Sequence, residues 1–539
     1  MTSQTPGILK LVSRRMLPAI GIAAVLLAGA ASGIRASHLA GPLLVTPHRG
    51  GSITIRTIGE DTCLNGELTG SNVAAQVDVG LTDPLVTADQ KGKLSPDLAT
   101  SWKISDGGKK ITFFLRHGVR FSNGDPFDAS SVKWNYEHVL SPKTKSPNAF
   151  ALGPLKAVKV LNKYTVRLVM KAVFRPLFTA LASYYFGMVD PRTTARLGSK
   201  ECLTLIGTGP FKLKSVGPAF NPIVMVRNPY HTWASPWQFN HGTAYLDQVT
   251  FRPILSDSTA TSELLTGGVQ VSEVAPTQIG RVQGNKTITI RKYPEEGEYY
   301  LQYNFKHAPL DNPNVRRALA EAIDRNALVR AAANGLGRPA YSALAVNVPD
   351  YDPQSRHYAA SYNPTDAQKL LKGIKLPTLT LLSFNDPTST TIDELIQAEL
   401  AQVGVNVSVQ SHAIADAAAL ARQGQYDIDL TYVTYDDPDL MYLVLEPGPT
   451  YSPYAPSMTS VLAKLTRYLT NARQSNNPAF VRRNYVAAQR LVNNLTLIDP
   501  LYSALDLFGI NKRVHGWHAN FFTLGYTVAP VLQDLWVSK

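Results

Sequence analysis

The sequence predicts an α/β fold, and three observations carry this prediction. Apolar and polar residues alternate in short runs such as 111–115, which is the pattern of half-buried strands. In longer stretches such as 391–403 the apolar residues recur three and four positions apart, as in amphipathic helices. That helix lies between the predicted strands 379–382 and 405–409, with Gly404 as its stop, so the three form a β–α–β unit.

The composition is that of a globular protein rather than a disordered or polytopic membrane protein. Of the 539 residues, 44% are hydrophobic and 17% are charged, and the length suggests roughly three or four domains. The net charge of +13 raises the question of a nucleic-acid or membrane-surface partner. However, no basic run exceeds two residues and no RNA-binding motif is present. We therefore expect a scattered basic surface and no nucleic-acid partner.

Residues 1–36 are typical of an export signal. Lys10, Arg14 and Arg15 form a positive region ahead of an apolar run, Leu17 to Ala31, that is short for a membrane span. The segment is either cleaved among its small residues or retained as an anchor. In both cases we expect the rest of the chain in the periplasm or at the extracytoplasmic cell surface.

Two details of this segment concern the route of export. Arg14-Arg15 partly resembles a twin-arginine signal, but Pro18 follows closely, so the Sec and twin-arginine routes both stay open. The stretch 26–29 (Leu-Leu-Ala-Gly) resembles the start of a lipoprotein box, in which Ala30 stands where the lipidated cysteine belongs. We therefore do not expect a lipoprotein. Residues 37–50 are a linker punctuated by Pro and Gly.

The most informative stretch runs from Leu94 to Leu140. Two alternating runs flank Asp106-Gly107-Gly108, which supplies the positive φ angles that a tight hairpin connection needs. A second turn signal, 123–126 (Asn-Gly-Asp-Pro), follows. Asp128 is then placed to cap a helix whose apolar residues fall on one face. The stretch predicts a hairpin, a turn and a helix in that order.

This stretch resembles the signature region of family 5 of the extracellular solute-binding proteins, the dipeptide and oligopeptide receptors of ABC importers. Further segments resemble the family in the right order along the chain. They are IGTGPFKL at 206–213, VRNPY at 226–230, and the strand and helix 299–325 with its PLDNPNVRRAL and AIDR.

The resemblance implies a two-lobed periplasmic-binding-protein fold of type II, in the large cluster C form with an extra subdomain. It places lobe I at 51–297 and 504–539, with a subsidiary subdomain at about 87–203, and lobe II at 298–503. Two or more crossings between the lobes form the hinge. The implied function is capture of a peptide-like or other polar solute by closure of the lobes, followed by delivery to a membrane permease. A monomer is expected.

The two cysteines, Cys63 and Cys202, exclude a multi-cysteine zinc site or an iron–sulfur cluster. In an exported protein they permit one disulfide, and two separate buried thiols are the alternative. His515 and His518 lie three apart, which suggests either a metal site or ordinary surface histidines. No nucleophile, base and orienting group assemble in the sequence, so we expect no catalysis, no cofactor and no metal. A secreted hydrolase remains a hypothesis that turnover of a ligand would revive.

Three segments are candidates to line the cleft that the family implies. They are the loop 60–64 after the first strand, the aromatic cluster 184–186 and the segment 432–439; ordinary packing or turn chemistry is the alternative for each. A further pair follows strand 379–382. The individual candidates are Glu60, Asp61, Tyr185, Phe186, Ser383, Asn385, Tyr432, Thr434, Tyr435 and Asp436.

The sequence departs from the family at both charge anchors for a dipeptide. Peptide-binding members typically carry an Asp three residues ahead of a D/E-P pair, where an ungapped match to Asp437-Pro438 places Thr434; Asp436 serves only in another register. Dipeptide receptors also carry an Arg after strand 379–382, where Ser383-Phe384-Asn385 stands. This favours longer peptides held through their backbone, or an uncharged oligosaccharide stacked on aromatic rings. A ligand sensor or scaffold for a membrane partner is the third alternative.

Overall fold

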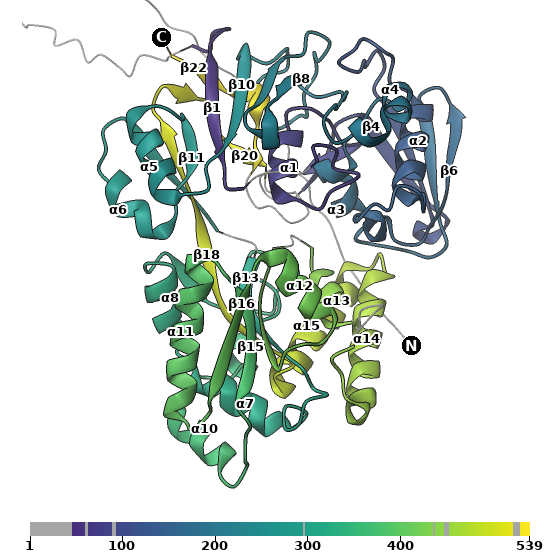
Figure 1. Cartoon of the computed structure of the whole chain (residues 1–539). Helices are drawn as coiled ribbons and strands as arrows, with labels where there is room; N and C mark the ends of the chain where they lie inside the picture. Colours follow the sequence, from purple (N-terminus) through teal and green to yellow (C-terminus); the bar gives the residue numbers. More distant parts are fainter. Residues whose placement is uncertain are drawn as a thin grey trace, which may run out of the picture. The chain divides into compact units, whose positions relative to one another are not determined.

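The computed structural model describes residues 46–59, 63–88, 93–294, 297–434, 437–446, 452–520 and 529–538. The export signal predicted at 1–36 and most of the linker therefore lie outside the described residues. The body from Pro47 to Lys539 is one compact unit by its contacts. Its mixed strands and helices confirm the predicted α/β class (Figure 1).

One set of strands forms what we call the N-terminal half-sheet. Its order is β11-β1-β10-β9-β8, and β12 joins through β18. Strand β1 pairs in parallel with β10 and β11, whereas β9 runs antiparallel to β10 and β8. The strands are β1 Ser52–Thr57, β8 Phe211–Val216, β9 Ile223–Arg227, β10 Gln248–Pro253, β11 Val271–Glu273 and β12 Ile288–Pro294.

A second set forms the C-terminal half-sheet, in the order β16-β15-β17-β13, with β14 attached through β18. Strands β15, β16 and β17 are mutually parallel, which confirms the predicted β–α–β unit around α11. Helix α11 begins at Pro387 rather than at the predicted Thr391, because Asp386 caps it and proline suits the first helical position. The strands are β13 Gly297–Tyr303, β14 Gly337–Pro339, β15 Leu379–Phe384, β16 Val407–His412 and β17 Ile428–Thr434.

A single strand, β18 (Ile498–Asn511), belongs to both half-sheets. Its first part pairs with β13, where Tyr502 faces Tyr299, and its last part pairs with β11 and β12, where Ile510 faces Val271. The chain therefore crosses between the half-sheets along a continuous strand, which Figure 1 shows in yellow.

A third, antiparallel sheet, which we call the small sheet, has the order β4-β5-β7-β6. It contains the predicted hairpin, and Asp106, Gly107 and Gly108 between its strands all have positive φ. Helix α2 packs on one face, capped by Asp128 as predicted (Figure 1). The strands are β4 Ala99–Ser105, β5 Lys110–Leu115, β6 Leu155–Asn162 and β7 Thr165–Met170. Strands β2 (Val86–Ala88) and β3 (Leu94–Pro96) form a separate pair ahead of it.

Helices cover the sheets and supply the buried apolar faces. Helices α11 and α12 pack on β15 and β16, α8 on β14 and β18, and α5 on β11 and β18. None of the helices that the structure describes combines the length and apolarity that a bilayer crossing requires. The helices are α1 Asn72–Asp78, α2 Ala129–Leu140, α3 Leu177–Leu181, α4 Pro191–Leu197, α5 Asp257–Thr266, α6 Ile279–Val282, α7 Pro313–Ala322, α8 Arg325–Ala332, α9 Ser355–Tyr358, α10 Pro364–Leu371, α11 Pro387–Gln402, α12 Ile414–Arg422, α13 Leu440–Leu445, α14 Thr459–Arg473 and α15 Pro478–Leu495.

The glycines of the segment IGTGPF hold the chain against the end of α1 and leave no space for a side chain. A Cβ on Gly209 would lie 2.5 Å from the carbonyl carbon of Leu81. The amide of Gly209 donates a hydrogen bond to the carbonyl oxygen of Leu81, at 3.0 Å. The segment is thus a turn that leads into β8, as its family resemblance implies.

The C-terminal segment returns to the N-terminal half-sheet and is fixed there by buried polar contacts. The Gln533 amide nitrogen donates to the carbonyls of Trp233, Asn240 and Gly242 at 2.7–2.9 Å. Asp534 accepts hydrogen bonds from the amides of Phe239 and Asn240. Short strands β19 (Val514–His515) and β22 (Trp536–Val537) pair beside it, as do β20 (Ala519–Asn520) and β21 (Ala529–Pro530).

Candidate functional site

The segment 174–179, which follows the small sheet and includes the first residues of α3, contacts the turn before α13 and the end of α14 directly; we call this segment the junction loop and the region around α13 and α14 the C-terminal region. The Thr179 hydroxyl donates to Asp437 Oδ2 at 2.7 Å, and the amide of Arg175 donates to the carbonyl of Arg473 at 2.8 Å. Asp437 begins the turn between β17 and α13. The junction therefore forms within the segment 432–439 in which the sequence predicts ligand contacts.

Arg473, in the last turn of α14, is the main partner of the junction loop. Its guanidinium lies 5.0 Å from the ring centre of Phe174 and 3.5 Å from that of Tyr442. Its Nε is 2.8 Å from Asp439 Oδ1. These groups border a hollow of about 280 Å³, lined by Gly153, Pro154, Val173, Phe174, Tyr442, Thr470, Arg473 and Gln474. The arginine thus contacts rings from two regions of the chain and forms a close ion pair with a buried acid.

Further charges surround the junction. Arg175 Nη2 lies 3.7 Å from Asp350 Oδ2. Burial raises the pKa of Asp439 to about 7, against the opposing effect of Arg473, and burial also raises the pKa of Asp350. Among the described residues, the buried Tyr485 hydroxyl has no hydrogen-bond partner. The junction thus buries ionisable groups from both sides, and their pairing depends on the junction loop remaining in place.

At the end of the C-terminal half-sheet, three tyrosine rings pack in a row across β17, β13 and β18. Tyr299 lies 4.7 Å from Tyr432 and 5.1 Å from Tyr502 between ring centres. Gly297 makes this packing possible, since a Cβ there would lie 2.4 Å from Thr434 Cγ2 and 2.7 Å from the Tyr432 hydroxyl. Two of the predicted residues, Tyr432 and Thr434, therefore lie together on β17 beside this glycine.

The opposite face of the same strands carries buried acids. Glu298 and Tyr300 on β13 lie on the same face as Asp429 on β17, which is opposite Gln302 in the register. Burial raises the pKa of Glu298 to about 8 despite Arg338, and burial alone raises that of Asp429 to about 8. At neutral pH both carboxyls are largely protonated, so each is able to donate a hydrogen bond.

The other predicted residues are placed as follows. Tyr185 and Phe186 are buried beside α1, and the Tyr185 hydroxyl donates to Asn72 Oδ1 at 3.2 Å. Ser383 is fully buried at the end of β15 near Asp393, whose pKa burial raises to about 7, whereas Asn385 is exposed. Strands β15 and β17 are adjacent and parallel, so their carboxyl ends lie at the same edge of the sheet. Ser383, Asn385 and Tyr432 are therefore all at this edge. Glu60, Asp61, Tyr435 and Asp436 lie outside the described residues.

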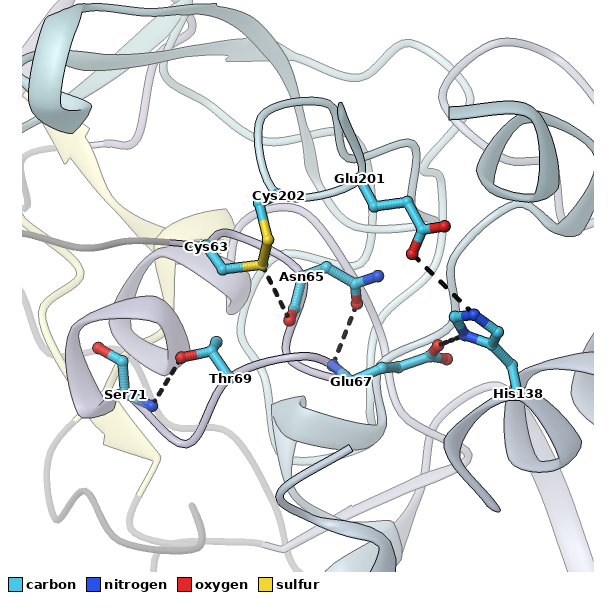
Figure 2. Close-up of a disulfide and its surroundings, with 8 residues drawn as sticks. All are labelled: Cys63, Asn65, Glu67, Thr69, Ser71, His138, Glu201 and Cys202. Carbon is cyan, nitrogen blue, oxygen red and sulfur yellow. Dashed lines mark hydrogen bonds and ion pairs between the residues drawn. A yellow bond between two sulfur atoms is a disulfide. The ribbon is translucent and has the colours of Figure 1, made fainter. Parts of the chain in front are cut away.

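Cys63 and Cys202 form a disulfide, and Figure 2 shows the groups around it. The amide of Glu67 donates to Asn65 Oδ1 at 3.0 Å, and the Glu67 carboxylate lies 2.6 Å from His138 Nδ1. Burial raises the pKa of Glu67 to about 7, and the bond to Glu67 raises that of His138. The bridge and this pair fix the loop that follows β1 to α2 and to the loop at 202.

His515 and His518 are not arranged to bind one metal ion together. His518 is buried and bonded to Asp534, whereas His515 stacks on the Trp536 ring at 4.1 Å. In the part of the chain that the structure describes, no three His, Cys, Asp or Glu side chains converge as metal ligands would.

Asp437 lies in the segment that the sequence predicts to line the cleft, but sequence reasoning missed its junction partners Arg175, Thr179 and Arg473. Each is ordinary in its local pattern, and Thr179 and Asp437 are 258 positions apart. The signal that the sequence does contain is weak. This signal is Phe174 and Arg175 just before Pro176, in a stretch whose apolar residues follow neither the strand period nor the helix period.

The chain was compared with protein families and with curated proteins. The model of the bacterial extracellular solute-binding proteins, family 5, matches residues 93–448. The glutathione-binding protein GsiB of Escherichia coli (strain K12) is 28% identical over 422 residues, which cover 75% of this chain and 79% of GsiB. GsiB of Shigella dysenteriae serotype 1 is 30% identical over 341 residues, covering 61% and 64% of the two chains.

Solved structures share the fold at lower identity. A dipeptide-binding protein from Pseudoalteromonas sp. SM9913, in complex with Met-Leu, has a TM-score of 0.76 at 20% identity, covering 90% of this chain and 100% of that one. NikA from Brucella suis, in complex with Fe(III)-EDTA, has a TM-score of 0.79 at 21% identity, with coverage of 90% and 100%. These likenesses confirm the predicted fold, a type II periplasmic-binding-protein fold of the cluster C form.

Proposed function

The chain belongs to family 5 of the bacterial extracellular solute-binding proteins, and from this premise we propose that it captures a peptide-like solute for an ABC importer. The solute binds between the two half-sheets, and the permease in the membrane receives it from the closed protein. Family members are binding proteins, and we propose that this chain, too, binds its ligand without chemical change.

One observation supports this proposal more than any other. The half-sheets are joined through β18, and the junction loop meets the C-terminal region at Asp437, within the predicted ligand segment 432–439. A ligand that touches this segment also acts on the contact between the two regions. Binding energy shifts a conformational equilibrium only when contacts differ between its states, and this placement meets that condition.

We propose that the ligand is peptide-like but not a dipeptide held by its two charged ends. The relatives named GsiB are glutathione-binding proteins. A structurally similar protein, the oligopeptide-binding protein AppA from Bacillus subtilis, has been solved in complex with a nonapeptide. The missing Asp at 434 and the missing Arg after β15 argue against two terminal ion pairs. Glutathione and peptides of three or more residues are therefore the first probes.

The finer assignments belong to the same proposal. Residues 1–36 direct export and leave the protein in the periplasm or at the cell surface as a monomer. Lobe I comprises 51–297 and 504–539 with its subdomain at about 87–203, and lobe II comprises 298–503. The course of β18 supports these boundaries, since its early residues pair with lobe II strands and its late residues with lobe I strands.

The proposal is tested by mass spectrometry of whatever co-purifies with protein secreted from its native host. Titration calorimetry then compares glutathione, a tripeptide, a dipeptide and a trisaccharide. We expect micromolar or tighter binding of a peptide-like probe, returned unchanged after release. Turnover of the probe, or binding of the trisaccharide alone, would contradict the proposed function.

A variant pair tests the location of the site. Tyr432→Phe removes a hydroxyl that is buried and has no partner among the described residues, next to Thr434. We expect affinity for the bound peptide to fall about tenfold, the effect of one hydrogen bond to the ligand. Tyr303→Phe removes a similarly buried hydroxyl from β13, away from the junction, and is the matched control. Equal losses in both variants would place the site elsewhere.

A further inference from the structure

The positive charge of the protein is concentrated in one part of the chain. Residues 99–171 contain 13 Lys and Arg but 4 Asp and Glu, a net charge of +9. The first 45 residues add four basic residues and no acid, which completes the total of +13. All other residues together are therefore neutral. The sequence predicts a scattered basic surface; the net excess outside the first 45 residues comes from the segment that forms the small sheet, its connections and α2.

The strand register aligns basic side chains in one row across the small sheet. Lys103 on β4 pairs with Thr112 on β5, Thr112 with Arg167 on β7, and Arg167 with Lys159 on β6. Paired residues in neighbouring strands point to the same face. Arg167 Nε donates to the Thr112 hydroxyl at 2.9 Å, which holds its guanidinium over the middle of the sheet.

This row lies on the face opposite the apolar core, which we call the outer face. The inner face carries Trp102 and Phe113, whose rings contact Phe178 of α3, and α2 packs there as well. Lys103 and Lys159 are exposed. Among the described residues, no helix other than α2 packs broadly on the small sheet, so the outer face is open.

Apolar side chains accompany the basic ones. Phe114 lies two residues after Thr112 on β5, so it points to the same face, and it is 42% exposed. Leu161 lies in a bulge at the end of β6 and is 44% exposed. Asp106, in the hairpin turn between β4 and β5, is paired with Lys110 at 3.1 Å. The outer face thus carries exposed basic side chains together with exposed apolar ones.

We propose that the outer face of the small sheet docks on a bilayer that contains anionic phospholipid. This inference rests on the proposed function, in which the protein meets its permease at a membrane. Lysine and arginine side chains bind anionic headgroups through charge, and exposed apolar residues reach the acyl boundary. The row spans four strands, so its basic side chains are spread widely enough to meet several headgroups of one bilayer surface at once.

Docking of this kind would hold the receptor near its importer without a permanent anchor. Each basic residue near an anionic surface strengthens partition about fivefold, so a few suffice for weak, reversible binding. Screening by salt weakens the attraction, because the charges are exposed. The residues of the outer face are distinct from those of the junction, so ligand capture and membrane docking are separable.

The test is sedimentation of the protein comprising residues 46–539 with vesicles of 30% phosphatidylglycerol in phosphatidylcholine. We expect binding at 50 mM salt that is lost at 300 mM, and no binding to pure phosphatidylcholine. The variant Lys103→Gln/Lys159→Gln should bind about 25-fold more weakly. The control Lys369→Gln/Lys372→Gln removes two exposed charges from the end of α10 and should bind as the wild type does.

Three outcomes would overturn the proposal: no vesicle binding at low salt, equal binding to neutral vesicles, or equal loss in the two variants. The first would leave an acidic protein as the partner of the outer face. Titration of the peptide probe with the same variants separates this proposal from the proposed function. Ligand affinity should be unchanged in both, whereas failure of the proposed function would appear as no ligand binding in any of them.

Discussion

At the scale of single residues, the contact between Thr179 and Asp437 shows how the two regions are coupled. The threonine is 7% exposed and the aspartate 5%, so their 2.7 Å hydrogen bond is shielded from water. A buried hydrogen bond to a charged group stabilises by about 1.5–3 kcal/mol, more than an exposed one. The same aspartate oxygens also order the turn, since Oδ1 accepts from the amide of Asp439 at 2.9 Å.

We predict that Thr179→Val loosens the junction without unfolding the protein. The valine leaves Asp437 Oδ2 buried without its donor, so the contact should weaken by about 2 kcal/mol. Hydrogen exchange by mass spectrometry checks this, because the Arg175 amide is bonded across the junction. Exchange in peptides covering 173–179 should accelerate about 30-fold.

Thr100→Val is the matched control for that experiment. Its hydroxyl bonds the carbonyl of Phe114 within the small sheet, at 3.1 Å, and makes no contact across the junction. Exchange in 173–179 should be unaffected in this variant. If Thr179→Val leaves the exchange rate as slow as in the wild type, the junction is held by other contacts and the assigned role of Asp437 is wrong.

At the scale of elements, most of the secondary structure could be predicted because its signals are local. The hairpin of the small sheet follows from alternation and from glycines with positive φ, and α2 follows from Asp128 and its apolar stripe. Helix α7 begins at Pro313 after Asn312, as the capping residue and proline indicate. Helix α11 starts four residues before the position that its apolar period indicates, because Asp386 and Pro387 set its first turn.

The candidate site could be predicted only to the level of segments. The turn after β17 was identified from family resemblance, and the structure adds that Asp437 in this turn bonds Thr179. Burial of Ser383 could not be predicted, because strand alternation does not say which helix covers the face; α11 and α12 both pack on β15. The basic outer face depends on a register across four strands, which is a long-range property.

The disulfide offers a test at this scale. It closes a loop of 139 positions and joins the loop after β1 to the end of the segment containing the small sheet. We predict that Cys63→Ala/Cys202→Ala lowers the free energy of unfolding by about 4 kcal/mol, chiefly by freeing the unfolded chain. Urea unfolding measures this, and reduction of the wild type should give the same loss. A change below about 1 kcal/mol would show that local packing alone holds the loop.

At the scale of the whole molecule, buried acids make stability depend on pH. Burial raises the pKa of Glu67, Asp393 and Asp439 to about 7 and that of Glu298 and Asp429 to about 8. The folded protein therefore holds more protons than the unfolded chain between about pH 4 and 8. Stability rises with pH only where the unfolded state binds more protons, so here these groups lower stability as pH rises.

We predict that the free energy of unfolding falls from pH 5 to pH 8, on the order of 5 kcal/mol in total. Urea unfolding at a series of pH values measures the slope. Asp429→Asn keeps the shape of the side chain but cannot ionise, so its slope should be visibly shallower than that of the wild type. Asp366→Asn, at an exposed position on α10, is the control and should keep the wild-type slope. A flat wild-type profile would mean that the buried acids are hydrated.

The attachment of the C-terminal segment to the N-terminal half-sheet has a consequence for biogenesis. Gln533 and Asp534 complete the hydrogen bonding of the loop at 233–242, and Trp536 packs beside His48 near the start of β1. The first region of the chain therefore lacks part of its own interior until the final residues have been synthesised. A polypeptide built this way finishes folding only after translation, so its N-terminal half-sheet cannot mature cotranslationally.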